Sequence, residues 1–434
     1  MNELDIFPIN TVRAAAGHLT VGGCDVVDLA TQFGTPLYIY DEATIRANCR
    51  AYLRPLRERY PNSSITYAGK AYLDPTILGI VREEGLGLDA VSGGEITLAL
   101  AAGFPAADIV FHGNNKLPDE VALALDAGVG RFAVDGEDDL RALSTLAAET
   151  GRTARVILRL TPGISAHTHE YIRTGMLDSK FGTPISTGDA ERLVRLALDS
   201  PGIELIGYHA HIGSQIFDVE PLADNATTLV EFALAMQERH GATFSVLSPG
   251  GGGGVRYVGT DDGLDIGRLV TAITDAVRAT LPPGHEPELI LEPGRSIIAP
   301  AGVAMYGVGT VKTIPGVRTY VAVDGGMADN IRPALYQAEY TAILAGRAPT
   351  DPTSTVTIVG RYCESGDILI HDIDLPDLRR GDLLAMPTAG AYSLALASNY
   401  NMSLRPAVVV VNNGQARLSR RRETYDDLLA GFPR

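Results

Sequence analysis

The chain has 434 residues, of which 45% are apolar and 20% are charged. This length exceeds what one domain usually contains, and a chain this apolar can bury large cores, so global disorder is excluded. The formal net charge of −16 argues against a nucleic-acid partner, because binding a phosphate backbone requires clustered Lys and Arg. We therefore expect more than one globular domain.

The first segment, MNELDIFPIN, has neither the basic nor the apolar stretch of a signal peptide. No uncharged apolar run reaches the ~18 residues that a membrane span requires. The three cysteines, Cys24, Cys49 and Cys363, cannot form a disulfide framework, and the chain has no C-x-x-C motif. These features predict a cytoplasmic protein with no membrane partner.

Short strand-like runs alternate with helix-like sequence between residues 64 and 294. The runs are SITYAGKA (64–71), LGLDAVS (86–92), DIVFHG (108–113), GRFAVD (130–135), ARVILRL (154–160), ELIGYHAHIG (204–213), FSVLSPG (244–250) and ELILEPG (288–294). Between them, stretches such as 117–128, 137–150 and 265–281 repeat apolar residues at the helical period. The alternation predicts parallel βαβ units, which close into a (β/α)8 barrel or form an open doubly wound sheet.

Polar residues or glycines stand at the C-terminal end of nearly every predicted strand. In a barrel these ends meet on one face, where loops build active sites, whereas an open sheet would spread them along a line. The residues are Lys70, Ser92 with Gly93 and Gly94, His112 with Asn114 and Asn115, Asp135, Arg159, His211 with Ser214, the glycine run 250–254, and Glu292 with Arg295. We therefore predict an α/β fold with a (β/α)8 TIM-like barrel over residues 36–295.

A long segment, 161–187, separates the fifth predicted strand from its helix. It contains His167, His169, Arg173 and Lys180, a dense set of groups able to meet a ligand. Long segments without structure of their own are usually functional or disordered. We interpret this one as an active-site loop, with a solvated surface loop as the alternative.

The alternation of predicted strands and helices ends after Arg295. Strand-like segments follow without 10–15-residue helices between them: VRTYVAVDGG, TSTVTIVGRYC, GDILIHDIDL, GDLLAMPT and LRPAVVVVNNGQARL. This pattern predicts a C-terminal antiparallel β domain, a β-sandwich or β-barrel over residues 296–434. We expect residues 1–35 to join it, since chain termini often lie close together.

Five consecutive glycines, Gly250–Gly254, follow the seventh predicted strand. Such a run is either a flexible linker or a backbone cradle, meaning a turn whose N–H groups close on an anion. The run matches neither a P-loop nor G-x-G-x-x-G, because Val255 stands where the last glycine of that motif would be. In barrels the loops after strands seven and eight often bind phosphate, so we favour a phosphate cradle at Gly250–Gly252.

Three further positions carry groups able to do chemistry. Lys70 is either a surface lysine or an amine that forms a Schiff base. Glu292 in EPGR either pairs with Arg295 or faces a protonated pyridine nitrogen, as pyridoxal phosphate requires. Cys363 is either a buried structural cysteine or an acid that protonates a carbanion.

The histidines leave more alternatives open. His209 and His211 are spaced to face the same side of one strand, and His167 and His169 share this spacing. Such pairs can bind a metal, stack on a flat cofactor or play a structural role. No obvious set of carboxylate ligands completes a metal site, so no metal is predicted.

A series of motifs, read in order, carries a resemblance to known enzymes. They are YAGKAY, DAVSGGE, FHGNNK, HTHEYIRTGMLDSKFG, HAHIGSQ, GGGGG, EPGR, VDGGMADNIRPALY, CESGD and AGAYSLALASNYN. With them the sequence resembles the diaminopimelate decarboxylases, which are fold-type III pyridoxal-phosphate enzymes with an alanine-racemase/ornithine-decarboxylase-like fold. The match runs from about residue 35 to the RRRETYDDLL segment. Gly253 departs from it, since relatives carry a bulky apolar residue there.

The resemblance implies a role for each matching residue. Lys70 forms the Schiff base with pyridoxal phosphate, His211 stacks on the ring, Glu292 faces the pyridine nitrogen, and Cys363 donates a proton. The residues implied to hold the phosphate are Ser214, Gly250, Gly251, Gly252, the backbone of Glu292, Pro293, Gly294 and Arg295, and Tyr392. Those implied to hold the substrate are Arg295, Arg332, Tyr336, Glu364 and Tyr392. Cys363 and Glu364 reach the other subunit's cofactor in this family, which implies a homodimer.

The implied reaction is decarboxylation of meso-2,6-diaminopimelate to L-lysine and CO2, the last step of lysine biosynthesis. A carboxylate at the pyridine nitrogen favours decarboxylation, whereas an arginine there would suit racemisation. Arg332 and Arg295 suit the second carboxylate of this substrate. The alternatives are a decarboxylase of another basic amino acid (ornithine, lysine or carboxynorspermidine type), a metal-dependent barrel hydrolase and a non-catalytic binding protein.

Overall fold

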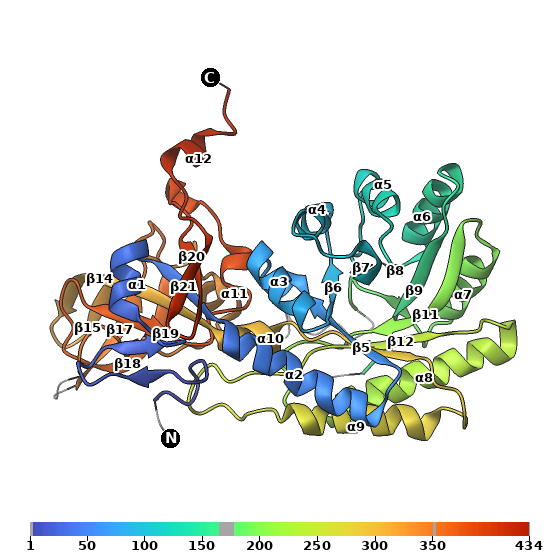
Figure 1. Ribbon diagram of the computed structural model, residues 1–434, viewed down its shortest axis with the longest axis horizontal. Coiled ribbons are helices and arrows are strands. Elements are labelled where there is room, and N and C mark those ends of the chain that lie inside the picture. The colour runs from blue at the N-terminus through green and yellow to red at the C-terminus, as the bar shows by residue number, and fades with distance from the viewer. Residues whose placement is uncertain (1–2, 165–177, 350–352, 434) are drawn as a thin grey trace. The chain divides into compact units, whose positions relative to one another are not determined.

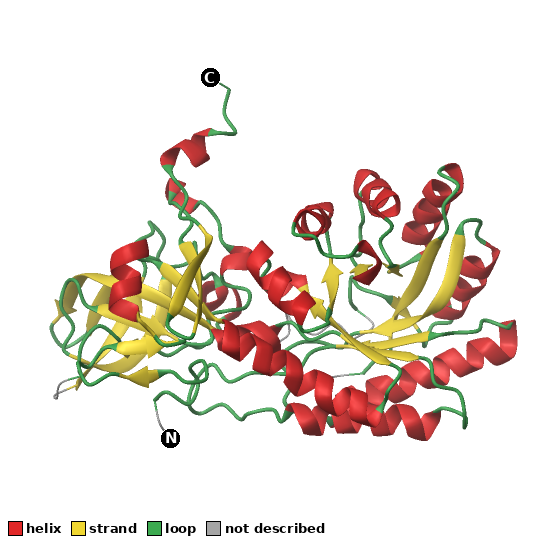
Figure 2. Cartoon of the chain, viewed as in Figure 1, coloured by secondary structure: helices red, strands yellow, loops and turns green. Residues whose placement is uncertain are grey.

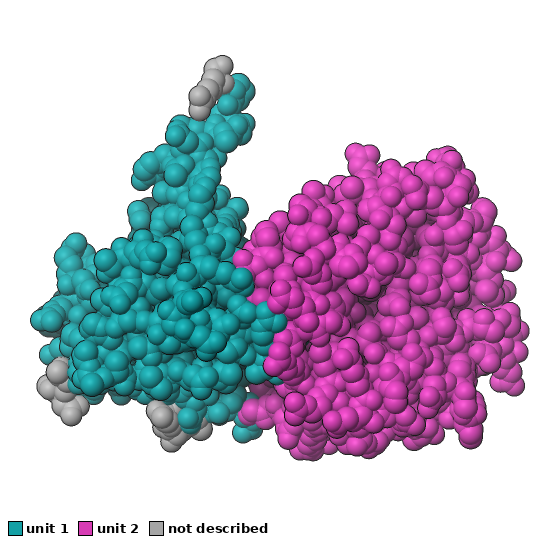
Figure 3. All heavy atoms as spheres, viewed as in Figure 1, with its two compact units in different colours: residues 1–47, 255–262, 297–434 teal, residues 48–254, 263–296 magenta. Residues whose placement is uncertain are grey.

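The computed structural model describes residues 3–164, 178–349 and 353–433. It divides into two compact units, shown in two colours in Figure 3. The barrel unit comprises Asn48–Gly254 and Gly263–Ser296, and the β unit comprises Met1–Ala47, Val255–Asp262 and Ile297–Arg434. In the described part of the chain, no helix is both long and apolar enough to cross a bilayer.

The barrel unit contains a closed parallel sheet. Its strands are β5 (Ser63–Ala68), β6 (Gly87–Ala90), β7 (Ile109–Phe111), β8 (Arg131–Val134), β9 (Ala154–Thr161), β11 (Ile203–Ala210), β12 (Val246–Gly250) and β13 (Glu288–Leu291). Neighbours in this order are paired in parallel, and β13 pairs with β5, which closes the ring. The predicted barrel is thus confirmed, and the open-sheet alternative is excluded. The short β10 (Thr183–Pro184) pairs with β9 beside the ring.

Helices surround these strands (Figures 1 and 2). They are α2 (Glu42–Arg59), α3 (Pro75–Glu83), α4 (Gly93–Ala101), α5 (Pro118–Ala127), α6 (Glu137–Glu149), α7 (Asp189–Asp199), α8 (Glu220–His240), α9 (Ile266–Thr280) and α10 (Arg295–Ile298). Several begin at side-chain caps: Asp74, Ser92 and Asp265 each accept a hydrogen bond from a backbone N–H of the first turn.

The barrel is filled by apolar side chains of six strands. These are Val110, Ala133, Ile157, Ile206, Val246 and Ile290. The interior is therefore a packed core rather than a pore, so the polar groups that follow the strands gather at its C-terminal mouth.

The β unit is built on a mostly antiparallel sheet. Its strands are β4 (Leu37–Asp41), β14 (Gly302–Ile314), β15 (Arg318–Val323), β16 (Ile343–Leu344), β17 (Thr353–Val359), β18 (Ile368–Pro376), β19 (Leu383–Met386), β20 (Ala407–Asn412) and β21 (Gln415–Arg420). The pairs β15–β17 and β4–β20 are parallel, and the other pairs are antiparallel. The unit also contains α1 (Val26–Phe33), α11 (Arg332–Tyr336) and α12 (Tyr425–Leu429).

The N-terminal segment belongs to the β unit and joins it through a sheet of its own. It forms a separate small sheet of β1 (Val12–Arg13), β2 (Leu19–Val21) and β3 (Cys24–Asp25), whose apolar side chains join the core of the unit. The strand that this end of the chain adds to the large sheet is β4, between β14 and β20. Every residue of β4 is buried, so it needs a covered, central place in a sheet. The division of the chain therefore falls after Ala47 rather than near residue 36.

Candidate active site

Three of the predicted site residues follow strands at the barrel mouth. Lys70 is exposed in the 3₁₀ turn Gly69–Ala71 after β5. His211 follows β11 and is half-buried, and Glu292 follows β13 and is buried. Burial, reinforced by the charge of Lys70, holds the pKa of His211 well below its ordinary value, so its imidazole is neutral at pH 7.

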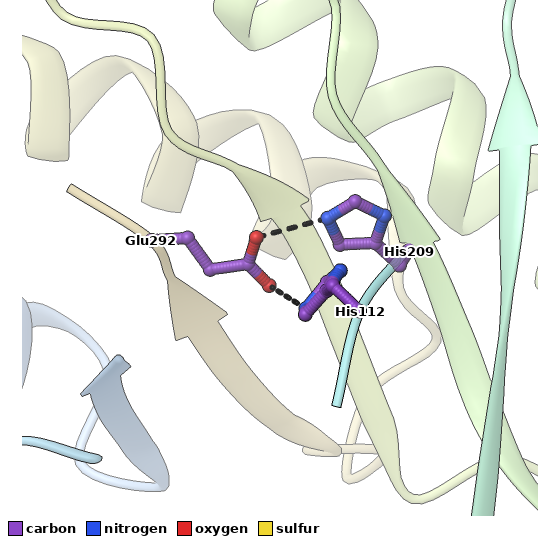
Figure 4. Close-up of side chains that lie close together, drawn as sticks. All are labelled: His112, His209 and Glu292. Atoms are coloured by element: carbon purple, nitrogen blue, oxygen red, sulfur yellow. Dashed lines mark hydrogen bonds and ion pairs between the residues drawn. The ribbon is translucent and has the colours of Figure 1, made fainter. Parts of the chain in front are cut away.

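Glu292 lies in a buried polar cluster (Figure 4). Nε2 of His209 is 2.9 Å from Oε2 of Glu292, and the Ser248 hydroxyl donates to Oε1 at 2.7 Å. Nε2 of His112 lies 3.7 Å from Oε1. Burial is the strongest single influence on the pKa of Glu292 and raises it, but the two histidines and the hydrogen bonds together lower that pKa well below its ordinary value.

A second carboxyl group, Asp89 on β6, borders this cluster. Its Oδ1 is 3.8 Å from Nε2 of His112. Burial, and next the charge of Glu292, raises the pKa of Asp89, while burial lowers the pKa of His112 far below its usual range. The two neighbouring carboxyl groups therefore divide their roles: Glu292 is ionised and Asp89 holds its proton.

The structure separates the two members of the predicted His-x-His pair. β11 ends at Ala210, so the strand alternation that would place both rings on one side stops before His211. His209 joins Glu292 and His112, whereas Nδ1 of His211 accepts a 3.4 Å hydrogen bond from the Gly251 N–H. His167, His169 and Arg173 of the other predicted group lie outside the described residues.

His112, His209 and Glu292 offer ligand atoms within 4.8 Å of one another, a donor set that transition metals accept. Two of these atoms, however, are already joined in a hydrogen bond, and Ser248 occupies the second carboxylate oxygen. We therefore interpret the cluster as a set of hydrogen bonds that holds the ionised carboxylate of Glu292 in place.

The glycine run begins where three strand ends approach one another closely. Gly250 has φ +76, and a Cβ there would lie 2.8 Å from the carbonyl oxygen of Ala210. A Cβ on Gly251 would overlap the backbone carbonyl of Glu292, and Gly252 also has positive φ (+119). Side chains are thus excluded from all three positions, so the turn itself presents only backbone. This geometry fits a cradle for an anion such as a phosphate group.

The rest of the run is held in place and is not a linker. Ile216 donates its N–H to the Gly252 carbonyl at 3.0 Å and accepts the Gly254 N–H at 2.9 Å. A Cβ on Gly253 would lie 3.0 Å from the Leu264 side chain, so a larger residue fits only if that side chain moves.

The EPGR segment lies beside the turn that carries Lys70. The Pro293 carbonyl accepts the Ala68 N–H at 3.2 Å, and a Cβ on Gly294 would be 2.9 Å from the Ala68 side chain. Nε of Arg295 donates to the Ser214 hydroxyl at 3.1 Å. Ser214 and Arg295, both predicted at the phosphate, therefore lie together.

In the β unit, Arg332 begins α11 and is buried, with 6% of its surface exposed. Its guanidinium carbon lies 4.3 Å from the ring centroid of Tyr257 and 5.3 Å from that of Tyr340, and it also donates to the Tyr340 hydroxyl. The two tyrosine rings are 5.2 Å apart and inclined by 77°. Among the described residues no carboxylate forms an ion pair with Arg332, so this buried cation calls for an anionic ligand.

Two further predicted substrate-binding residues of the β unit are half-buried tyrosines. Tyr336 ends α11. Tyr392 has φ +59, a left-handed conformation that is rare for a bulky side chain. The neighbouring Thr388 shares it, with φ +53, and its hydroxyl bonds the carbonyl of Arg256 at 3.1 Å. Strain of this kind concentrates at functional sites.

Cys363 and Glu364 are exposed, which excludes the interpretation of Cys363 as a buried structural cysteine. The Cys363 N–H donates to the Asn401 side chain at 3.0 Å. The buried Asp367 accepts the N–H groups of Tyr362 at 2.8 Å and Met327 at 2.6 Å. The loop that presents Cys363 is therefore held from both sides.

Sequence reasoning missed Asp89, Ser248, Tyr257 and Tyr340. Ser248 had a signal: on paired parallel strands it stands beside His209, at the position that faces the same side of the sheet. Tyr257 and Tyr340 had none, because only the folded chain brings them to Arg332.

Comparisons with known proteins agree with this geometry. Residues 42–299 match the family model "Pyridoxal-dependent decarboxylase, pyridoxal binding domain". Diaminopimelate decarboxylase of Bacillus subtilis (strain 168) is 46% identical over 95% of this chain and 94% of that protein. The crystal structure of diaminopimelate decarboxylase from M. jannaschii superposes with a TM-score of 0.92 at 33% identity, covering 98% of both chains.

The enzyme from Helicobacter pylori complexed with L-lysine has a TM-score of 0.86 at 32% identity, covering 93% of this chain and 98% of that one. These relatives match the chain over nearly its whole length. The chain belongs to the pyridoxal-dependent decarboxylases and, within them, to the diaminopimelate decarboxylase family.

Proposed function

We propose that this enzyme decarboxylates meso-2,6-diaminopimelate to L-lysine and CO2, the last step of lysine biosynthesis, with pyridoxal 5'-phosphate as its cofactor. The observation that carries the proposal is the buried, ionised Glu292 at the barrel mouth, beside a glycine turn that admits no side chain. The first suits a protonated pyridine nitrogen, and the second suits a phosphate. Both groups belong to this cofactor.

When bound, pyridoxal phosphate supplies an electron sink for the electrons released with CO2. Lys70 would hold its aldehyde carbon, His211 would lie against its ring, and Glu292 would hold a proton at the pyridine nitrogen. The residues proposed at the phosphate are Ser214, Gly250, Gly251, Gly252, the backbone of Glu292, Pro293, Gly294 and Arg295, and Tyr392.

Arg332, which pairs with no carboxylate in the described part of the chain, supports this substrate over its alternatives. Meso-diaminopimelate has a carboxylate that does not react, and a planar guanidinium binds carboxylates with two hydrogen bonds. L-ornithine and L-lysine have no second carboxylate, so they would leave the buried cation uncompensated. We propose that Arg332, Arg295, Tyr336 and Tyr392 bind the substrate and that Glu364 receives its distal ammonium group.

We further propose that the exposed Cys363 returns a proton to the carbon that loses CO2. In this family the cysteine reaches the partner subunit's cofactor, so we propose a homodimer. The three free thiols fit a reducing compartment such as the cytoplasm.

Two measurements test the proposal. Purified protein supplied with pyridoxal phosphate should show a visible absorption band that Lys70→Ala loses, and absence of the band in the wild type would refute the cofactor. The wild type should release CO2 from meso-diaminopimelate but not from L-lysine or L-ornithine. Release from the latter two alone would favour the alternative decarboxylases.

The role of Cys363 has a separate test. Cys363→Ala should keep the visible band and lose turnover, whereas the matched variant of the buried Cys24, Cys24→Ala, should keep turnover in its folded fraction. Full activity in Cys363→Ala would remove this cysteine from the mechanism.

A further inference from the structure

We propose that His209 and Ser248 are positioning residues for Glu292, which keep its carboxylate ionised and in a single orientation by donating one hydrogen bond to each oxygen. The inference rests on the proposed function, because the orientation matters only if Glu292 serves a pyridine nitrogen. Its basis is independent of that function: both contacts lie wholly within the barrel unit.

The fold places both donors on neighbouring strands. His209 of β11 and Ser248 of β12 are register partners, so their side chains leave the sheet side by side. His209 is 1% exposed and Ser248 is fully buried. Neither donor therefore exchanges its bond for one to bulk water, so both bonds hold the carboxylate in the orientation observed.

The direction of each hydrogen bond follows from which of its two atoms can donate a proton. The Ser248 oxygen accepts the Gly250 N–H at 3.2 Å, which leaves its own proton for Glu292 at 2.7 Å. An ionised carboxylate only accepts, so Nε2 of His209 carries a proton toward Glu292. Each carboxylate oxygen keeps a lone pair for a further donor, such as a pyridinium N–H.

The charges around Glu292 have to be counted together, because several groups titrate there. Nε2 of His112 lies 3.7 Å from Oε1 of Glu292 but donates no hydrogen bond to it. The charge of Glu292 also shifts the pKa values of His211 and Asp89. Burial keeps the pKa of His112 and of His211 low and that of Asp89 high, so these three are neutral near pH 7. Lys70 and Arg159 are the cations that act on Asp89, His112 and His211. His209 and Ser248 are the groups that offset the burial of Glu292 through hydrogen bonds.

The test compares His209→Phe, which keeps a ring without a donor, with His209→Gln, which keeps an amide donor. His209→Phe should lower kcat by ~10- to 100-fold, as expected for a hydrogen bond to a buried charge, with KM nearly unchanged. It should also weaken pyridoxal phosphate binding to the apoprotein. His209→Gln should recover most of both losses.

Ser248→Ala should lower kcat by about tenfold. Its matched control is Ser144→Ala, since the Ser144 hydroxyl is also buried and donates to the Pro201 carbonyl, away from the cluster. A smaller change is expected for His112→Phe than for His209→Phe, because Nε2 of His112 lies 3.7 Å from Oε1 and donates no hydrogen bond to it. Equal effects of the two histidine variants would contradict the proposed hydrogen bond.

The pH dependence separates positioning from a merely structural role. Activity requires ionised Glu292, so it is lost as the pH falls through the pKa of that group. His209→Phe removes a donor, raises this pKa and should move both the acid limb of kcat and the acid change of the bound cofactor's spectrum to higher pH. A loss of kcat with unmoved pH profiles would overturn the proposal.

A double-mutant cycle tests whether His209 acts through Glu292. If His209 acts through Glu292, adding His209→Phe to Glu292→Gln should cause no further loss of kcat or of cofactor affinity. Additive losses would show that His209 acts elsewhere. These outcomes differ from failure of the proposed function, which would show as a wild type without a visible band or CO2 release.

Discussion

The two units each bury a charged side chain, but they treat it in opposite ways. In the barrel unit, Glu292 has a hydrogen-bond donor on each oxygen and histidines around it. In the β unit, Arg332 lies against the rings of Tyr257 and Tyr340, with no carboxylate paired to it among the described residues. One charge is supplied with partners before any ligand arrives, and the other is left without a counter-ion.

The difference indicates what each charge is for. A carboxylate that must stay ionised in a dry site needs donors built into the fold, since burial alone would neutralise it. A cation that must bind a carboxylate needs the opposite: a built-in acid would compete with the substrate. Aromatic rings support the guanidinium without neutralising it, because they attract it through their π faces.

The largest expected effect comes from neutralising the barrel charge. Glu292→Gln should lower kcat on the order of 10³-fold, as loss of a preorganised electrostatic group typically does. The matched control is Glu288→Gln, at the other end of β13, where the carboxylate pairs with Arg131 near the surface. The control should keep its kcat in steady-state assays of CO2 release, and a comparable loss there would mean that Glu292 acts through strand stability.

The next effect tests the unpaired cation. Arg332→Met should lower kcat/KM for meso-diaminopimelate by ~10²- to 10³-fold, mainly through KM, because the substrate carboxylate loses its partner. Thermal stability should stay the same or rise, since an uncompensated buried charge is removed.

Arg347→Met provides the opposite case in the same unit. Arg347 binds both oxygens of Asp382, at 2.9 and 2.8 Å, and so has the carboxylate partner that Arg332 does not find among the described residues. This variant should lose stability and keep KM. If Arg332→Met is instead the less stable of the two, the interpretation of Arg332 as a ligand-binding cation is wrong.

A third prediction concerns a carboxyl group of the β unit that has hydroxyl donors but forms no ion pair with the residues that the structure describes. Asp329 accepts from Tyr306 at 2.6 Å and Tyr38 at 3.1 Å, yet burial raises its pKa to about 6. Its folded pKa exceeds the unfolded value, so its contribution to stability is full below pH ~4 and is lost as the pH rises through about 6.

Asp329→Asn should remove this loss, which amounts to at most about 3 kcal/mol in the free energy of unfolding. Denaturant titrations at a series of pH values would measure it. Asp382→Asn should change the pH dependence of the free energy of unfolding in the opposite direction. Arg347 helps to lower the pKa of Asp382, so the stability that this carboxylate contributes in the wild type is lost as the pH falls. If both variants changed the slope of the unfolding free energy against pH in the same direction, the opposite pKa shifts of Asp329 and Asp382 would be contradicted.

The smallest effect is expected at the tyrosines around Arg332. Tyr340→Phe removes one hydroxyl contact but keeps the ring, so KM for meso-diaminopimelate should rise only several-fold, as for ~1 kcal/mol, with kcat unchanged. Tyr340→Leu removes the ring too and should raise KM further. Inhibition by L-lysine, which retains the distal carboxylate, should weaken in parallel, whereas inhibition by cadaverine should not.

Much of the barrel could be predicted from the sequence, because its signals are local. Each predicted run from 64–71 to 288–294 overlaps an observed strand, and the polar residues after the strands lie at the mouth because parallel strands share one direction. β4 could not be assigned this way. Its run LYIYD reads as a buried strand, but nothing local distinguishes a barrel neighbour from its observed partners β14 and β20.

The residues of the candidate site also differ in whether local sequence signals predict their place. Lys70, the glycine turn and Glu292 are adjacent to strand ends, so their place was predictable from order alone. His209 and His211 looked equivalent, and only the end of β11 at Ala210 separates them.

The sequence by itself determined the order of strands and helices, the residue types at the strand ends and, through its motifs, the family. Periodicity, turn chemistry and motif spacing are properties of neighbouring residues, so they can be recognised in the sequence without knowledge of the fold. Only the tertiary structure decided that Ser248 and His209 bond to Glu292 and that Tyr257 and Tyr340 contact Arg332. Those contacts join residues far apart in the chain, and their charges acquire meaning only when burial removes water around them.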